Sequence, residues 1–427
     1  MKLDSYWTAT ATAHPVLEKP LPARADVAIV GGGFTGLSAA VALGRRGARV
    51  VVLEAGAMAG EASGRNGGHV NNGLAVDYAT LAASVGTQRA SAWYRAYDAA
   101  VDSVARIVRE EAIDCNFLRN GKLKLAARAS DYDTLARGFD RLHREVDCDV
   151  ELLDAAAIRD EIQSERFVGG LLQKRSAQMH MGRFGAGLAQ AAERHGAELH
   201  AQTEVRRLER VRGHVHKLHT GRGVVEADLV LVATGATMHG SYPSFGFWRR
   251  RIVPIGSFII VTEPLGPELA RRILPGIRTY TTAAHIHNYF RLTPDDRLVF
   301  GGRARFAMSS PNSDAKSGHI LREAMTWVFP QLSKTRIDYC WGGMVDMSRD
   351  RLPHAGEHRG LYYAMGYSGH GTQMSVHMGQ CMADVMAGDL AANPWRDLAW
   401  PAIPGHFGPP WFLPVVGAYF KLKDALR

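Results

Sequence analysis

Residues 26–56 read DVAIVGGGFTGLSAAVALGRRGARVVVLEAG, the pattern of a strand, a glycine turn, a helix and a second strand. Val27–Val30 is an apolar run typical of a parallel strand that is covered on both faces. Gly31, Gly33 and Gly36 form G-x-G-x-x-G, whose glycines allow a tight turn, the approach of a pyrophosphate and close packing of helix on strand. The stretch predicts an α/β, Rossmann-like domain that binds a dinucleotide.

An acidic residue completes this unit. Glu54 follows the second strand, Val50–Leu53, and lies 21 residues after Gly33, where a carboxylate binds ribose hydroxyls. A glycine-rich strand–helix turn without a ligand is the simpler alternative, but it leaves the complete unit unexplained. Glu54 and its neighbour Ala55 are therefore predicted to contact the dinucleotide.

Composition limits the class of protein. The chain has 427 residues, enough for roughly two or three domain-sized units. Its formal charge is +9, but the basic residues are spread out and form no block, which argues against nucleic-acid binding. No apolar run reaches the roughly 20 residues that span a bilayer, so no transmembrane segment is expected. The N-terminus lacks a signal pattern, and the four cysteines form no C-x-x-C pair. We expect a cytoplasmic protein without a disulfide framework or a metal site.

The rest of the chain alternates between two predicted domains. Residues 57–73 read as a loop without helix or strand, and residues 117–127 as two strands joined at Asn120–Gly121. Glu198–Val205 and His214–His219 read as strands linked by a basic turn. The β-rich segments between 251 and 301 predict a largely antiparallel sheet, inserted into the dinucleotide domain.

These patterns give approximate boundaries. The dinucleotide domain would be discontinuous (24–75, 165–240 and 341–390), and the second, substrate-binding domain would comprise 76–164 and 241–340. Residues 1–23 would form an extended N-terminal arm, and 391–427 a C-terminal docking segment.

Two further glycine-rich loops predict a flavin. In the first, which follows the ribose acid, backbone amides and Arg65 would line a flavin ring or its phosphates: Ser63, Gly64, Arg65, Asn66, Gly67 and Gly68. The second, Gly366–Thr372, lies between a strand and a helix whose N-terminus would stabilise negative charge on a reduced flavin. A surface loop and a plain strand–helix connection are the alternatives. Two such loops in one chain favour a flavin over a nicotinamide.

The remaining cofactor contacts are predicted around these loops and after the buried strand that ends in Ala-Thr-Gly. They are Phe34, Thr35, Val205, Thr234, Gly235, Gly343, Gly369, His370, Gly371, Thr372 and Gln373.

The motifs resemble those of the D-amino-acid-oxidase-like FAD-dependent oxidoreductase family. The resemblance is carried by IVGGGFTGLSAAVAL, VVVLEAG and GEASGRNGG, and by WGGMVDMSRDRLPHAG (341–356) and LYYAMGYSGHGTQMS (361–375). Within this family the chain resembles the gamma-glutamylputrescine oxidoreductase branch. That likeness rests on Ser5-Tyr6-Trp7, IVPIGSFIIVTEPL (252–265), NYFRLTPDDRLVFGGR (288–303) and the YFKLKDAL tail.

The resemblance implies FAD-dependent oxidation of a C–N bond in an amine. A hydride would pass to flavin N5 from the carbon that carries nitrogen, and the imine would hydrolyse to an aldehyde and an amine. The expected substrate is gamma-glutamylputrescine or a related polyamine-type amine, and oxygen or another acceptor would take the electrons. A secondary N-alkyl amino acid as substrate, or a flavin subunit of a larger dehydrogenase, remains the alternative. We expect a monomer or a homodimer.

Three positions depart from relatives in this family. Sarcosine oxidases carry a lysine for the substrate carboxylate where this chain has Gln373, and a neutral amide cannot supply that charge. They attach FAD to a cysteine at the position that aligns with Gly343, and a lysine linked to oxygen activation aligns with Val299. The departures imply an amine rather than an amino acid, non-covalent FAD, and oxygen as a poor acceptor.

The substrate contacts are predicted at Arg65, His287, Tyr289, Arg303, Trp341, His370 and Gln373. Tyr289 and Trp341 would wall an amine pocket with their ring faces, and Arg303 would pair with a carboxylate. Core packing and a surface ion pair are the alternatives for these residues. No catalytic base is predicted, because the reaction requires a neutral amine rather than a strong base.

Overall fold

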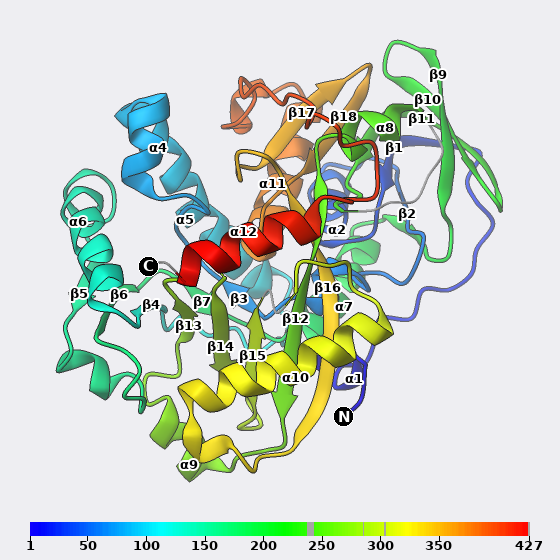
Figure 1. Ribbon diagram of the computed structural model, residues 1–427. Helices are drawn as coiled ribbons and strands as arrows, with labels where there is room; N and C mark the ends of the chain where they lie inside the picture. Colours follow the sequence, from blue (N-terminus) through cyan, green and yellow to red (C-terminus); the bar gives the residue numbers. More distant parts are fainter. Residues whose placement is uncertain (237–242, 285, 303–304, 426–427) are drawn as a thin grey trace.

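The computed structural model describes residues 1–236, 243–284, 286–302 and 305–425, and it contains two large sheets (Figure 1). The strands of the first run, in spatial order, β17 (His354–His358), β18 (Leu361–Met365), β11 (Gly223–Val232), β1 (Arg24–Val30), β2 (Val50–Leu53) and β8 (Glu198–His200). From β18 to β8 neighbouring strands are parallel, and β17 is antiparallel to β18. The predicted α/β, Rossmann-like class is confirmed.

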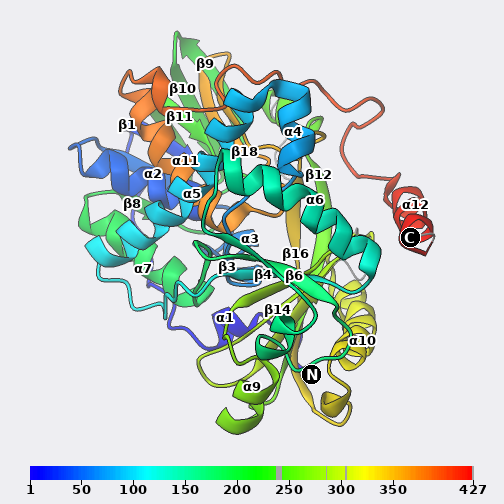
Figure 2. The ribbon, with the colours of Figure 1, turned by 90° about the vertical axis from the view of Figure 1, so that its left-hand side faces the viewer.

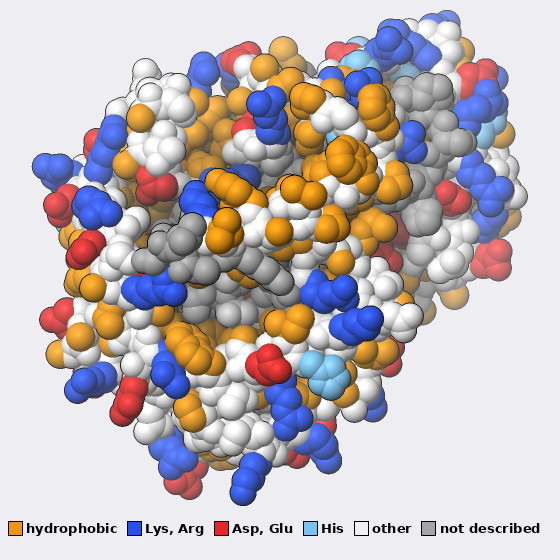
Figure 3. All heavy atoms as spheres, in the orientation of Figure 1, with side chains coloured by type: hydrophobic (Ala, Val, Ile, Leu, Met, Phe, Trp, Pro, Cys, Tyr) orange, Lys and Arg blue, Asp and Glu red, His pale blue; other side chains and the backbone are white. Residues whose placement is uncertain are grey.

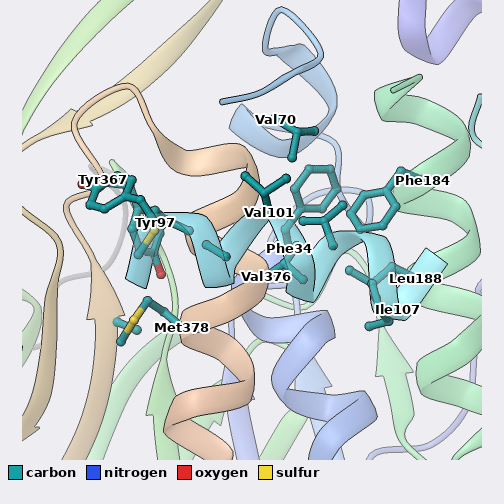
Figure 4. Packing of buried hydrophobic residues seen from close by; sticks show 14 of the residues in the cluster. Phe34, Val70, Tyr97, Val101, Ile107, Phe184, Leu188, Tyr367, Val376 and Met378 are labelled. Carbon is teal, nitrogen blue, oxygen red and sulfur yellow. The ribbon is translucent and has the colours of Figure 1, made fainter. Parts of the chain in front are cut away.

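A layer of helices covers one face of this sheet. It consists of α2 (Phe34–Gly44), α5 (Thr87–Glu110), α7 (Met181–Arg194) and α11 (Gly371–Met386). Their apolar faces meet in one core, in which Phe34 packs edge-to-face on Phe184 (Figure 4). Gly379 of α11 lies so close to the backbone of α2 that a Cβ would stand 3.0 Å from the amide nitrogen of Ala39. The two helices whose N-termini lead out of the glycine loops are therefore held rigidly together.

The other face carries the meander of β9 (Val205–Arg212) and β10 (Val215–Thr220). The predicted end of a strand at Val205, followed by a basic turn, was wrong. The basic residues lie within β9, where Leu208 is buried opposite Leu218 while Arg207 is exposed. Arginines on the solvent face of an edge meander resemble a polar turn in composition, although they continue the strand.

The second sheet is the predicted, largely antiparallel one. Its order is β16 (Ile337–Met347), β12 (Val253–Thr262), β15 (Leu298–Gly302), β14 (Asn288–Leu292), β13 (Thr279–Thr282), β4 (Lys122–Ala126), β6 (Gly169–Gln173) and β5 (Val150–Leu153). The pair β13–β4 is parallel and the other pairs are antiparallel. Because β6 and β16 belong to this sheet, the boundaries expected at 165 and 341 are displaced.

Alternation along the strands gives the second sheet two different faces. One is apolar, with Phe258, Phe290 and Phe300 packed beneath α9 (Pro267–Ile273) and α10 (Pro311–Val328). The opposite face turns towards the first domain and carries Tyr289 and Arg291. At the far end of the sheet α6 (Ala129–Glu145) lies along β4 and β6, next to α4 (Tyr78–Val85) (Figure 2).

Three local predictions were wrong. Residues 117–127 form no hairpin, because Leu118 bridges to Gln178 while β4 pairs with β13 and β6. The stretch 57–73 contains a short helix and a short strand: α3 (Ala62–Arg65) and β3 (His69–Val70), which pairs with β7 (Ala177–Gln178). The N-terminal arm is not wholly extended, since it forms α1 (Tyr6–Ala9) with Trp7 fully buried. In each case partners distant in sequence decide the structure.

The remaining elements lie at the periphery: η1 (Ala157–Asp160), α8 (Pro243–Arg249), η2 (Pro330–Leu332), η3 (Leu390–Ala392) and α12 (Leu413–Ala425). The C-terminal α12 docks through buried Leu413, while Val415 and Tyr419 of this helix and the preceding Trp411 are exposed. Apolar side chains accordingly gather over this segment on the face shown in Figure 3. No helix within the described residues is long and apolar enough to cross a membrane.

Candidate active site and cofactor site

The turn from β1 to α2 has the geometry that the glycine pattern predicts. Gly31 has a φ of +109°, and a Cβ there would collide with Ala233, which follows β11. A Cβ on Gly36 would collide with the carbonyl oxygen of Gly31 and lie 3.0 Å from Ile29 Cγ2. The N-terminus of α2, beginning at Phe34 and Thr35 with Gly33 as N-cap, therefore starts directly at the end of the strand. Backbone N–H groups at such a position bind phosphate.

Glu54 stands at the end of β2 beside this turn. Its carboxylate accepts hydrogen bonds from the backbone nitrogens of Gly32 at 2.6 Å and of Gly56 at 2.7 Å. Val205 is buried close by in one cluster with Leu53, whereas Ala55 is exposed. Thr234 and Gly235 follow β11, the strand beside β1. The predicted dinucleotide contacts thus gather at the carboxyl ends of three adjacent parallel strands, where ligands of such sheets bind.

The first flavin loop is fixed between the two domains. Arg65 Nε donates to the carbonyl oxygen of Gly342 at 2.7 Å, and Trp341 Nε1 donates to the carbonyl oxygen of Arg65 at 2.8 Å. A Cβ on Gly343 would touch Arg65 Cβ at 3.2 Å. Fully buried Trp341 therefore holds this loop against β16.

Ser63 and Asn66 connect the loop to both glycine turns. Ser63 Oγ accepts a hydrogen bond of 3.0 Å from the backbone nitrogen of Phe34, and Gly64 is buried next to it. Asn66 Oδ1 accepts from the backbone nitrogen of Gly68 at 2.9 Å and from Thr372 Oγ1 at 3.3 Å. The two predicted flavin loops are thus in direct contact.

The second loop leads into α11. Gly369 has a φ of +93°, and α11 begins at Gly371 with His370 as N-cap. Gln373 Nε2 donates to the carbonyl oxygen of Asn71 at 2.5 Å. The N-terminus of α11 therefore carries backbone amides and, at buried Gln373, a neutral side-chain amide.

Two buried imidazole nitrogens have no hydrogen-bond partner among the described residues: His370 Nδ1 and His69 Nε2. Burial, together with the positive charges of Lys122 and His287, lowers the pKa of His370 to about 3. Burial likewise lowers the pKa of His69 well below its ordinary value. Both rings are uncharged at neutral pH, and unpartnered buried nitrogens are a common feature of ligand sites.

The second sheet closes the site from the other side. The ring of Tyr289 lies against the backbone of Gly67 and Gly301, and its hydroxyl is hydrogen-bonded to Ser257 at 3.0 Å. Val299, at the position of the lysine in relatives, is fully buried. His287 is half-buried at the start of this region, and Arg303 lies outside the described residues.

Several residues of this site were missed by the sequence reasoning. His69, Asn71 and Lys122 lie within segments that read as loop or strand, and Arg291 lies in the NYFRLTPDDRLVFGGR motif that carries the resemblance. His69 directly follows Gly67 and Gly68, so a polar residue beside a glycine cluster was the available signal. The position of Arg291 could not be read locally, because it depends on contacts far away in sequence.

The arrangement fits an adenine dinucleotide with a flavin. The glycine turn packs too closely for side chains at Gly31 and Gly36, the carboxylate of Glu54 stands beside it, and the unpartnered His370 Nδ1 lies at the second loop. Within the described residues no cluster of His, Cys, Asp and Glu could hold a metal ion.

Comparisons with known proteins agree with this geometry. The model of the family described as "FAD dependent oxidoreductase" matches residues 26–385. The gamma-glutamylputrescine oxidoreductase of Escherichia coli (strain K12) is 31% identical over 99% of this chain and 98% of its own length. The glycine oxidase of Geobacillus kaustophilus is 27% identical over 85% of this chain and 93% of its own length. The crystal structure of glycine oxidase from that organism superposes with a TM-score of 0.73 at 24% identity, covering 90% of this chain and 100% of that chain.

The predicted cofactor and class of enzyme are confirmed. FAD is the cofactor, and relatives act on amines and amino acids. The chain belongs to the FAD dependent oxidoreductase family, as an oxidoreductase of amines or amino acids.

Proposed function

We propose that this enzyme oxidises the terminal amine of gamma-glutamylputrescine or of a related gamma-glutamylated polyamine. Likeness to the Escherichia coli enzyme over 99% of the chain supports the substrate class. The observation that carries the proposal is the uncharged lining next to the flavin loops, where Gln373 and the neutral imidazoles of His69 and His370 stand. A substrate carboxylate close to the flavin would find no fixed charge there among these three side chains.

The same lining suits an amine. FAD, when bound, accepts a hydride from the carbon that carries nitrogen, which requires an uncharged amine. The positive charges of Lys122 and Lys124, which lower the pKa of His370, would also lower that of an ammonium group bound next to it. His370 Nδ1 and His69 Nε2 are the acceptors we assign to the N–H groups of the bound amine. Their role is to orient the amine, while Tyr289 and Gly67 exclude water.

The glutamyl end of the substrate carries a carboxylate, and the second sheet offers it a cation. Lys124 lies on β4, on the same face as Lys122, whose ammonium donates to the carbonyl oxygen of Asn72 at 3.0 Å. Two strand spacings, roughly 10 Å, separate β4 from Tyr289 on β14. Extended gamma-glutamylputrescine covers roughly 12 Å from amine to carboxylate, at the ~3.5 Å that an extended chain spans per three bonds. We assign Lys124 to the carboxylate end.

The test is the anaerobic bleaching of flavin absorbance by gamma-glutamylputrescine, putrescine, sarcosine and glycine. We expect fast bleaching by gamma-glutamylputrescine alone. Fast bleaching by sarcosine and none by gamma-glutamylputrescine would replace the proposal with oxidation of a secondary N-alkyl amino acid. If none of the amines bleaches the flavin until a second protein is added, the chain would be a subunit of a larger dehydrogenase.

A variant pair tests the carboxylate contact. Lys124→Gln is expected to raise the KM for gamma-glutamylputrescine about tenfold, the change that follows from losing one charge-assisted contact of about 1.4 kcal/mol. It should leave the slow reaction with putrescine unchanged. Lys174→Gln is the matched control, because Lys174 is exposed and paired with Glu151. An equal effect of Lys124→Gln on both substrates would contradict the assignment.

A further inference from the structure

Arg291 on β14 is a buried cation without a counter-ion. The residue is 2% exposed, and its guanidinium group donates only to neutral oxygens. These are the carbonyl oxygens of Gly67 at 2.9 Å, Met179 at 2.8 Å and Leu292 at 3.1 Å, and Gln178 Oε1 at 3.1 Å. The indole of Trp7 covers the guanidinium, 4.8 Å from Cζ to the ring centre. Among the described residues no carboxylate lies at ion-pair distance from Arg291.

Two other cations of the second sheet reduce the cost of their charge in ways that Arg291 does not. Arg278 forms a bidentate pair with Glu161, at 2.7 and 2.9 Å. Burial lowers the pKa of Lys122 to about 7, against the opposing effect of Asp98 and Asp147, so this side chain gives up part of its charge at neutral pH. Burial lowers the pKa of Arg291 to about 9, so the group still carries its charge at neutral pH. Burying an isolated charge lowers the free energy of unfolding, and a hydrocarbon side chain at this position would not have that effect.

The position of the Arg291 guanidinium in the fold indicates which negative charge offsets it. Arg291 holds Gly67, and a Cβ on Gly68 would collide with the guanidinium. Gly67 and Gly68 belong to the loop that lines the flavin site, so a single stretch of backbone separates the charge from that site. FAD bound at this loop would supply a transient anion, because the flavin ring becomes more negative on reduction.

We propose that Arg291 provides, from behind the Gly67–Gly68 loop, the fixed positive charge that stabilises the negative charge of reduced FAD. Arg291 is in this view a positioning residue for the loop and an electrostatic determinant of the flavin reduction potential. The role is independent of which amine is oxidised.

The experiment compares Arg291→Lys with Arg291→Gln in the FAD-bound enzyme. Both variants keep a hydrogen-bond donor, and only the first keeps the charge. The readouts are the flavin midpoint potential and the Kd of sulfite, whose addition to oxidised flavin places negative charge on the ring. We expect sulfite binding to weaken at least about tenfold in Arg291→Gln, because a unit charge is lost from a partly buried site. Arg291→Lys should stay within about threefold of the parent enzyme.

Arg278→Gln is the control, since that charge is already paired with Glu161. It should leave the potential and the sulfite affinity unchanged. Equal sulfite affinity in Arg291→Lys and Arg291→Gln would overturn the proposal, and so would loss of FAD by both variants, because then the hydrogen bonds matter and the charge does not. The result is distinct from the substrate test, because sulfite binding involves no amine.

Discussion

The indole Nε1 of Trp7 donates a hydrogen bond of 2.6 Å to the carbonyl oxygen of Asn66, which lies 59 residues further along the chain. Ser5 adds a second bond to the same loop, from its hydroxyl to the carbonyl oxygen of Gly64 at 2.9 Å. A segment that precedes the first strand therefore fixes the loop that lines the flavin site. The arm thus contacts the predicted flavin loop, although none of its residues belongs to a glycine motif.

Trp7→Phe is expected to weaken FAD binding. The ring keeps its packing, but the carbonyl oxygen of Asn66 loses its donor, which costs about 1–3 kcal/mol for a buried acceptor. We expect the Kd of FAD to rise about tenfold in a fluorescence titration of the apoprotein. Trp411→Phe is the control, because Trp411 is 73% exposed. Unchanged FAD affinity in Trp7→Phe would contradict the proposal that the arm holds the flavin loop in place.

Gly36→Ala is expected to abolish FAD binding and to lower stability. The added methyl group would meet the carbonyl oxygen of Gly31 and Ile29 Cγ2, and neither the strand nor the helix can move without opening the turn. Gly246→Ala in α8 is the matched control, because no atom lies within 4 Å of its added Cβ. The measurements are the flavin content of the purified proteins and their unfolding midpoints. Normal flavin content in Gly36→Ala would contradict the close helix–strand packing.

The site could be predicted from sequence only where contiguous residues determine it. Gly31 to Glu54 specify their own strand–turn–helix unit, so the local sequence predicts that unit and a dinucleotide site at its turn. Arg291 contacts Gly67, which is 224 residues away in the sequence, and no local sequence pattern predicts that contact. The hairpin expected at Asn120–Gly121 failed for the same reason, since the turn residues fit but Leu118 finds its partner in Gln178. The periodicity of apolar residues predicts which side chains are buried, but it does not predict which residues they pack against.

FAD is expected to be released by denaturation. Gly343 faces the flavin loop, whereas Cys340 lies on the opposite, apolar face of the second sheet and its thiol donates to the carbonyl oxygen of Asp314 at 3.2 Å. Residues three apart on a strand point to opposite faces, so this thiol cannot reach the flavin. Acid precipitation should leave all yellow colour in the supernatant. Flavin that stays with the precipitated protein would show a covalent link and overturn this prediction.

His377 is expected to make the protein sensitive to acid. Burial lowers its pKa to about 4, and its Nδ1 is hydrogen-bonded to Ser103 Oγ at 3.0 Å. The folded state therefore keeps the ring neutral, while the unfolded chain binds a proton below about pH 6.5. Stability from this group is complete above pH 6.5 and is lost as the pH falls towards 4, by about 1 kcal/mol at pH 5.5.

The pH dependence of the free energy of unfolding would not isolate the effect of His377. Burial raises the pKa of Asp98 and of Asp346 to about 6, so these carboxyl groups favour the folded state in acid. The comparison of parent protein with His377→Gln removes their contribution, since both proteins contain them. Urea unfolding at pH 7.5 and 5.5 should show that acidification destabilises the parent by about 1 kcal/mol more than the variant. Equal losses in the two proteins would mean that His377 is protonated in the folded state as readily as in the unfolded one.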